Sequence, residues 1–178
     1  MSLATLGELL VHELSDTVSA ENIVLEMLGA LATESKIADI RAAVKHHESE
    51  TKQQLKNLDK VFSILGEKPE KTTCHAAEGL KEEHSALGEE DPSQLVLEIG
   101  NLAGAVKTEH YEIASYTALI QMAKDLGEKD VAALLKENLD QEKEMARTIL
   151  TLAKQVGKDI RAAEKRAVAK QKRTKVSR

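Results

Sequence analysis

The chain has 178 residues, is 42% hydrophobic and 31% charged, and carries a net charge of −5. This length suits one domain with a substantial core, and a single cysteine, Cys74, excludes an intrachain disulfide and favours a reduced, cytoplasmic setting. The N-terminus lacks the basic region of a signal peptide, and no apolar run approaches the length of about 20 residues that spans a membrane.

The first third of the chain is expected to form two long helices, over residues 3–33 and 36–65. Apolar residues recur in both segments at spacings of three and four, as on the core-facing side of bundle helices. Gly66 and Pro69 mark the end of the second helix, as a C-cap glycine and a following proline do. The turn between the two helices is short, which predicts an antiparallel hairpin.

The second half repeats this plan, with helices expected over residues 92–126 and 129–156. Asp91 followed by proline is typical of an N-cap and first helical position. Residues 66–92 form a connection long enough to cross the bundle, with a short helix expected inside it. The predicted fold is all-α, a ferritin-like four-helix bundle over residues 1–157, built from two antiparallel hairpins and a long crossover connection.

The C-terminal segment 158–178 differs from the body in charge. It holds nine basic and two acidic residues, a net charge of +7, which leaves −12 for the remainder of the chain. We expect this tail to be partly helical and mobile at its end. A solubilising terminus, docking on a partner subunit, and weak, salt-dependent contact with nucleic acid are its alternative roles.

Four glutamates are predicted to lie at one depth in the bundle. Glu21 and Glu50 are equidistant from the first hairpin turn, and Glu112 and Glu142 are equidistant from the second. Residues equidistant from the turn of an antiparallel pair lie at the same height. Each of the four helices therefore offers one carboxylate to a common layer.

Two further side chains lie one helical turn from this layer, His47 before Glu50 and Glu109 before Glu112. Buried carboxylates are normally paired or bound to metal, and two divalent ions would offset four ionised carboxylates. Carboxylates with an imidazole suit iron or manganese better than zinc. The alternatives are that each glutamate flanks the core and reaches solvent, and that His47 is a hydrogen-bonded core histidine.

Three more residues are expected to support this layer. Gln54 and Tyr116 follow Glu50 and Glu112 by four residues, a spacing that suits hydrogen bonds to those carboxylates, although Tyr116 can equally be a packing residue. His110 is expected to point inward, as a core residue or a partner of the ligands. The cysteine and histidines of the connection, Cys74, His75 and His84, match no zinc motif.

Several segments resemble the YciE/YciF-type ferritin-like stress proteins, which are related in fold to rubrerythrin: 12-HELSDTVSAE-21, 47-HESETKQQ-54, 61-VFSILGEKP-69, 71-KTTCHAAEGL-80, 109-EHYEIASYTALI-120 and 134-LLKENLDQEK-143. The resemblance implies a ferritin-like bundle that is usually a homodimer, a link to stress responses, and a dinuclear iron or manganese site. It implies the metal ligands Glu21, Glu50, Glu112 and Glu142, with Glu109 and His47 beside them.

The chain also departs from the ferritin-like pattern of Glu-x-x-His on two helices. Gln53 and Met145 stand where those histidines would be, and His47 precedes its glutamate instead. Two hypotheses follow. In the first, a dinuclear centre reacts with peroxide or dioxygen, dismutating hydrogen peroxide or oxidising ferrous iron. In the second, the bundle binds metal weakly or not at all and acts as a structural or interaction protein.

Overall fold

The computed structural model describes the backbone of residues 3–176 and the side chains of residues 3–169. Five helices and no strand occur in this range: α1 (Leu6–Glu34), α2 (Ala38–Leu65), α3 (His75–Glu89), α4 (Gln94–Asp125) and α5 (Lys129–Val176). The predicted all-α class and the short helix in the crossover connection are therefore confirmed. None of these helices is apolar over a length that would cross a membrane.

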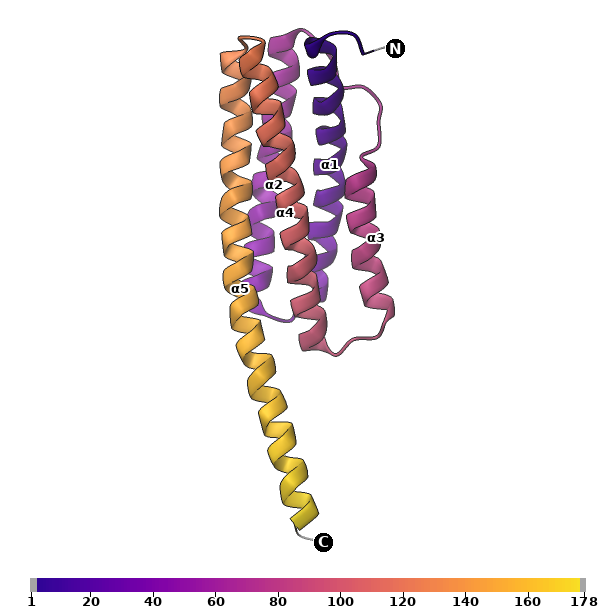
Figure 1. Ribbon diagram of the computed structural model, residues 1–178, viewed down its shortest axis with the longest axis vertical. Helices are drawn as coiled ribbons and strands as arrows, with labels where there is room; N and C mark the ends of the chain where they lie inside the picture. Colours follow the sequence, from indigo (N-terminus) through magenta and orange to yellow (C-terminus); the bar gives the residue numbers. More distant parts are fainter. Residues whose placement is uncertain (1–2, 177–178) are drawn as a thin grey trace.

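Four of the helices form a closed ring in the order α1, α2, α5, α4. Each of them runs antiparallel to both of its neighbours (Figure 1). The crossover from α2 to α4 traverses the length of the bundle, and its helix α3 packs on the outside of α1 and α4. This is the predicted ferritin-like bundle, with an interior where the inward faces of four helices meet.

The helix ends are set by local sequence. Thr5 and Glu8 form a capping box at the start of α1. Gly66 ends α2 in the left-handed conformation, with φ of 70°, as predicted. The N-cap of α4 is Ser93 rather than Asp91. Asp91 itself has a φ of 48°, so it closes the α3–α4 turn and cannot occupy the extended conformation of an N-cap.

A polar layer divides the bundle core into two apolar clusters. The upper cluster includes Leu10, Leu14, Leu58, Phe62, Leu119 and Leu135. The lower cluster includes Val24, Leu28, Ile40, Val44, Leu102, Met145 and Ile149. On every helix of the ring, the residues between these two sets include a buried acid or histidine. The acidic layer predicted from hairpin symmetry thus lies between two apolar clusters that exclude water from both sides.

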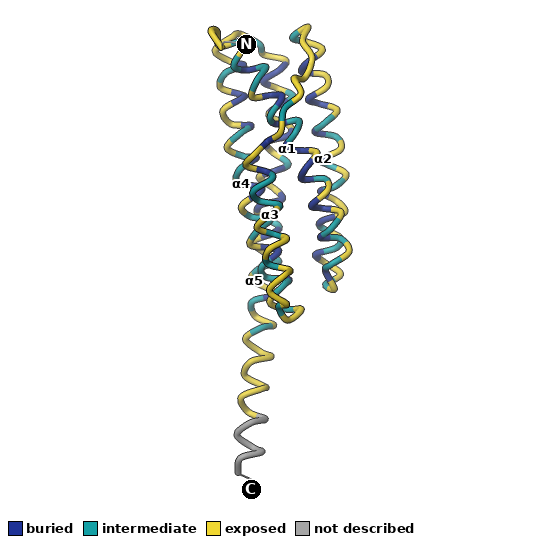
Figure 2. The backbone as a smooth tube through the Cα atoms, turned by 90° about the vertical axis from the view of Figure 1, so that its right-hand side faces the viewer, coloured by how far each residue is buried: buried dark blue, intermediate teal, exposed yellow. Residues whose placement is uncertain are grey.

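The last residues of α5 that pack on the lower cluster are Val156 and Ile160. Beyond them α5 projects from the body as a single helix (Figure 1), and its side chains are exposed through residue 169 (Figure 2). The segment 158–176, predicted as a partly helical tail, is helical throughout. Its mobility stays a prediction, and residues 177–178 lie outside the described range.

A carboxylate that the sequence did not single out holds the α1–α2 turn. Glu98 of α4 is 1% exposed. It accepts hydrogen bonds from Ser35 Oγ at 2.8 Å, from the Lys36 backbone N–H at 2.6 Å and from Gln94 Nε2 at 3.0 Å. Glu98 therefore ties the first hairpin to α4 below the lower apolar cluster.

Replacing Glu98 by Gln should lower the free energy of unfolding by about 1–3 kcal/mol, because an amide nitrogen would face donors that now have a buried acceptor. Urea unfolding followed by circular dichroism measures the change. The matched control is Glu90→Gln at an exposed position near the α3–α4 turn. Equal stabilities of the two variants would contradict this role of Glu98.

Candidate metal centre

All four helices of the ring bring an acid or imidazole to the middle layer. Glu21 comes from α1, His47 from α2, Glu109 and Glu112 from α4, and Glu142 from α5, and each is at most 2% exposed. Four of them, all except Glu21, offer one ligand atom each within 4.8 Å of one another. This group can hold a metal ion.

His47 lies at the centre of the group. Its Nε2 atom is 3.4 Å from Glu109 Oε1 and 3.5 Å from Glu142 Oε2, while its Nδ1 atom is 3.2 Å from Glu50 Oε2. The bond through Nδ1 orients the ring, so that Nε2 faces the two inner carboxylates. A ligating histidine is commonly held in this way by a carboxylate on its other nitrogen.

Several buried atoms of this layer lack a hydrogen-bond partner among the described residues. Both carboxylate oxygens of Glu112 are in this condition, as are one oxygen each of Glu21, Glu109 and Glu142, and His47 Nε2. A buried polar atom without a partner is costly. Converging carboxylate oxygens of this kind need positive charge between them, as a cation or as protons.

Burial perturbs the titration of these groups. It raises the pKa of Glu112 and of Glu142, and the charges of neighbouring glutamates raise both further. Burial also raises the pKa of Glu21 to about 7, against the opposing effect of the Tyr116 hydrogen bond. For His47, burial lowers the pKa, but the contacts with Glu109 and Glu50 outweigh it and the pKa rises. The metal-free layer therefore retains protons.

Gln54 and Tyr116 support the layer, but with partners different from those expected. Gln54 is fully buried and donates to Glu142 of α5, and Tyr116 donates to Glu21 of α1. The sequence spacing had paired them with Glu50 and Glu112 of their own helices. Both side chains instead extend to another helix, because a side chain that points into a bundle meets the inward faces of the other helices.

Asn138 extends this support and was not recognised from the sequence as part of the site. Its Nδ2 atom donates to Tyr116 Oη at 3.0 Å, and its Oδ1 atom accepts from Asn57 Nδ2 at 2.8 Å. Asn138 is fully buried. The sequence did contain a signal for this role, because Asn138 is a polar residue on the predicted inward face of its helix, one turn from Glu142.

Two predicted site residues are not among the buried side chains of the layer. The Glu50 side chain is 20% exposed, at the edge of the layer between His46 and His47, and the hydrogen bond from His47 lowers its pKa. Its role as a ligand stays a prediction. His110 is exposed, and its Nδ1 donates to the Val106 carbonyl at 2.9 Å. The expectation that His110 points inward is wrong, because α4 turns Glu109 and Glu112 toward the core and residue 110 away from it.

Comparison with known proteins identifies relatives over most of the chain. The profile of a family described as a domain of unknown function (DUF892) matches residues 5–169. The protein YciF of Escherichia coli K12 is 38% identical over 144 residues, which cover 80% of this chain and 87% of that protein.

Solved structures agree with this relation. The structure of the E. coli stress protein YciF has a TM-score of 0.85 at 34% identity, and covers 88% of this chain and 99% of that one. YcfI of Rhodopseudomonas palustris, provisionally described as a structural protein, has a TM-score of 0.82 at 34% identity over 84% of this chain and 96% of its own. A protein of Xanthomonas campestris shares the fold at 22% identity, with a TM-score of 0.72 over 90% and 99% of the two chains.

The raised pKa values predict how stability depends on pH in chelator-treated protein. Between the ordinary glutamate value of 4.5 and about 7, folded Glu21 holds a proton that the unfolded chain has released. Stability should therefore fall as pH rises through this window, and Glu112 and Glu142 act in the same direction. Urea unfolding at a series of pH values measures the slope. Glu112→Gln should flatten it, whereas a wild-type stability that rises from pH 5 to 7 would contradict the assignment.

Proposed function

Since the chain belongs to the DUF892 family, with YciF among its relatives, we propose that it is a stress-response protein that binds two iron or manganese ions. The observation that carries this proposal is Glu112, whose two oxygens are buried without a partner among the described residues and converge with other carboxylates. Two divalent cations would balance the four carboxylates of Glu21, Glu109, Glu112 and Glu142.

The donor set supports iron or manganese over zinc. The buried layer offers four carboxylates and one imidazole, and the chain's single cysteine, Cys74, forms a hydrogen bond with Tyr111 Oη on the α3 side. Structural zinc sites favour thiolate and imidazole ligands, whereas carboxylates suit harder ions. When bound, such ions supply redox chemistry toward peroxide or dioxygen.

The chain's own residues have separate tasks in this proposal. His47, Glu109, Glu112, Glu142 and Glu21 bind the ions. Tyr116 and Gln54 orient Glu21 and Glu142 through their hydrogen bonds, and the two apolar clusters keep bulk water from the layer.

A second candidate function is that of a structural or interaction protein. It is favoured by the long projecting part of α5 and by the lone inward histidine of the layer, since ferritin-like sites ordinarily contain two Glu-x-x-His motifs. The projection carries basic residues, so an acidic partner, a second subunit or nucleic acid would suit it. Metal binding decides between the two candidates.

Ferrous or manganous ion should raise the melting temperature by mass action, because the folded state alone presents the assembled ligands. Glu112→Gln and Glu142→Gln should remove most of this rise. Glu144→Gln, at an exposed position of α5, is the matched control and should retain it. Thermal unfolding with and without metal, combined with elemental analysis, measures both effects. Equal metal-induced shifts in all four proteins would refute the metal site and favour the interaction protein.

The metal-loaded protein should consume hydrogen peroxide faster than the same concentration of free metal, because the layer holds the ions in a water-poor environment. Consumption without added ferrous iron indicates dismutation, and consumption that requires it indicates oxidation of that iron. Peroxide loss and oxygen release are followed with electrodes, with Glu112→Gln as the inactive control. A rate of peroxide consumption no higher than that of free metal would contradict the proposed activity.

A further inference from the structure

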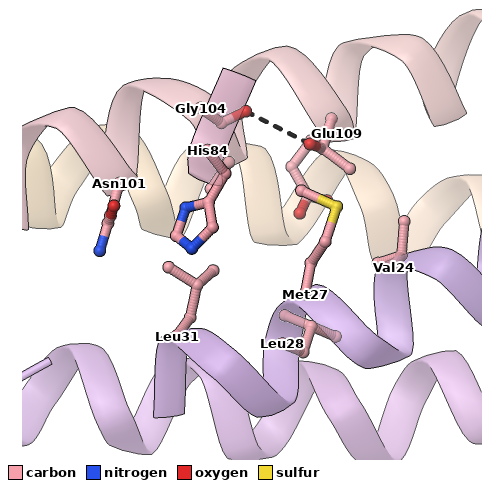
Figure 3. A pocket seen from close by; sticks show the side chains of 10 residues that line it. Val24, Met27, Leu28, Leu31, His84, Asn101, Gly104 and Glu109 are labelled. Atoms are coloured by element: carbon pink, nitrogen blue, oxygen red, sulfur yellow. Dashed lines mark hydrogen bonds between the residues drawn. The ribbon is translucent and has the colours of Figure 1, made fainter. Parts of the chain in front are cut away.

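A small cavity leads to Glu109 from the α3 side of the bundle. It has a volume of about 20 Å³, enough for one water-sized molecule. Its walls on α1 are apolar, and α3 and α4 complete it (Figure 3). The residues of α1 that line it are Val24, Met27, Leu28 and Leu31.

The cavity adjoins a larger groove of about 410 Å³ on the surface between α3 and α4. His84 of α3 and Gly104 of α4, both labelled in Figure 3, line both spaces and therefore lie where the cavity and the groove meet. A Cβ atom built on Gly104 would meet no atom within 4 Å. The missing side chain of Gly104 thus leaves this passage free.

Hydrogen-bond acceptors lie at both ends of the cavity. Asn101 Oδ1 and Glu109 Oε2 are buried and lack a partner among the described residues. The Asn101 amide is held by its Nδ2 atom, which donates to Glu34 Oε2 at 3.1 Å, and Glu34 also lies 3.3 Å from His84 Nε2. The orientation of Asn101 is fixed in this way, with its oxygen left to receive a donor.

A second cavity of about 20 Å³ meets the first at the same residues. It extends into the lower apolar cluster, and Leu28, Leu31, Asn101, Ala105 and Glu109 line both. The first cavity adjoins the α3–α4 groove at His84 and Gly104, whereas the second shares no lining residue with that groove. Of these two spaces, the first therefore offers the carboxylate layer a path to the groove.

The geometry points to the passage from the α3–α4 groove, past His84 and Gly104 to Glu109, as the route by which hydrogen peroxide reaches the carboxylate layer. Hydrogen peroxide is a small neutral molecule with two O–H donors, which complement Asn101 Oδ1 and Glu109 Oε2. Apolar walls disfavour ions, and the carboxylates of Glu34 and Glu109 repel anions. This inference rests on the proposed function.

The test fills the passage at Gly104. Gly104→Leu places a branched side chain there, and Gly104→Ala adds only a methyl group. Gly29→Leu makes the larger change at an exposed position of α1 that lines neither cavity. Each variant replaces a glycine inside a helix, so none should lose helix stability. Met27→Ala widens the same passage and should act in the opposite direction.

Two rates are measured on ferrous-loaded protein whose iron content is equal by elemental analysis. One is the anaerobic binding of nitric oxide, followed by stopped-flow absorbance, and the other is peroxide consumption at low peroxide concentration. Gly104→Leu should slow both by about tenfold or more while Gly104→Ala and Gly29→Leu remain near wild type. Met27→Ala should speed both.

The outcomes separate this inference from the function on which it rests. Wild-type protein that takes up neither iron nor manganese, or that consumes no peroxide with either metal, refutes the proposed function and the route with it. Wild-type protein that does both, with a nitric oxide binding rate unchanged in Gly104→Leu, overturns the route alone.

Discussion

The removal of carboxylates from water is the energetic cost around which this bundle is arranged. Glu21, Glu112 and Glu142 are almost fully buried, and burial raises the pKa of each. The two apolar clusters above and below keep water away from these carboxylates, so water cannot solvate their charges. Protons and metal ions therefore compete for one set of oxygens, which couples pH, metal content and stability in a single layer.

The same layer is held by hydrogen bonds that cross between helices. Tyr116 of α4 binds Glu21 of α1, and Gln54 of α2 binds Glu142 of α5. Asn138 of α5 donates to Tyr116 and also lies 3.3 Å from the backbone oxygen of Gln54. Glu21 and Glu142 are thus each positioned from another helix, so the geometry of the site depends on the packing of the whole ring.

Hairpin symmetry and helical periodicity predicted the depth of Glu21, Glu112 and Glu142 correctly, because both depend only on distance along a regular helix. They did not predict how far each helix is rotated about its axis. That rotation places Glu50 at the rim and His110 outside. The sequence also did not reveal the hydrogen-bond partners of Gln54 and Tyr116, because they lie on other helices. Glu98 could not be told from an ordinary acid at the edge of the core in a chain with 30 acidic residues.

The crossover helix α3 determines what reaches the layer from the α1–α4 side. It lies so close to α4 that a Cβ atom on Gly100 would collide with Leu87 Cδ2 and would displace the Leu87 side chain. Yet Ala77 is the one buried residue among the fifteen of α3. The salt bridges of α3 with Glu26 and Lys107, formed by Lys81 and Glu83, lie at the surface, where salt bridges contribute little to stability. Few buried contacts mean a low free energy of local opening. Because α3 carries His84, the least firmly attached helix of the five is the one that borders the passage to Glu109.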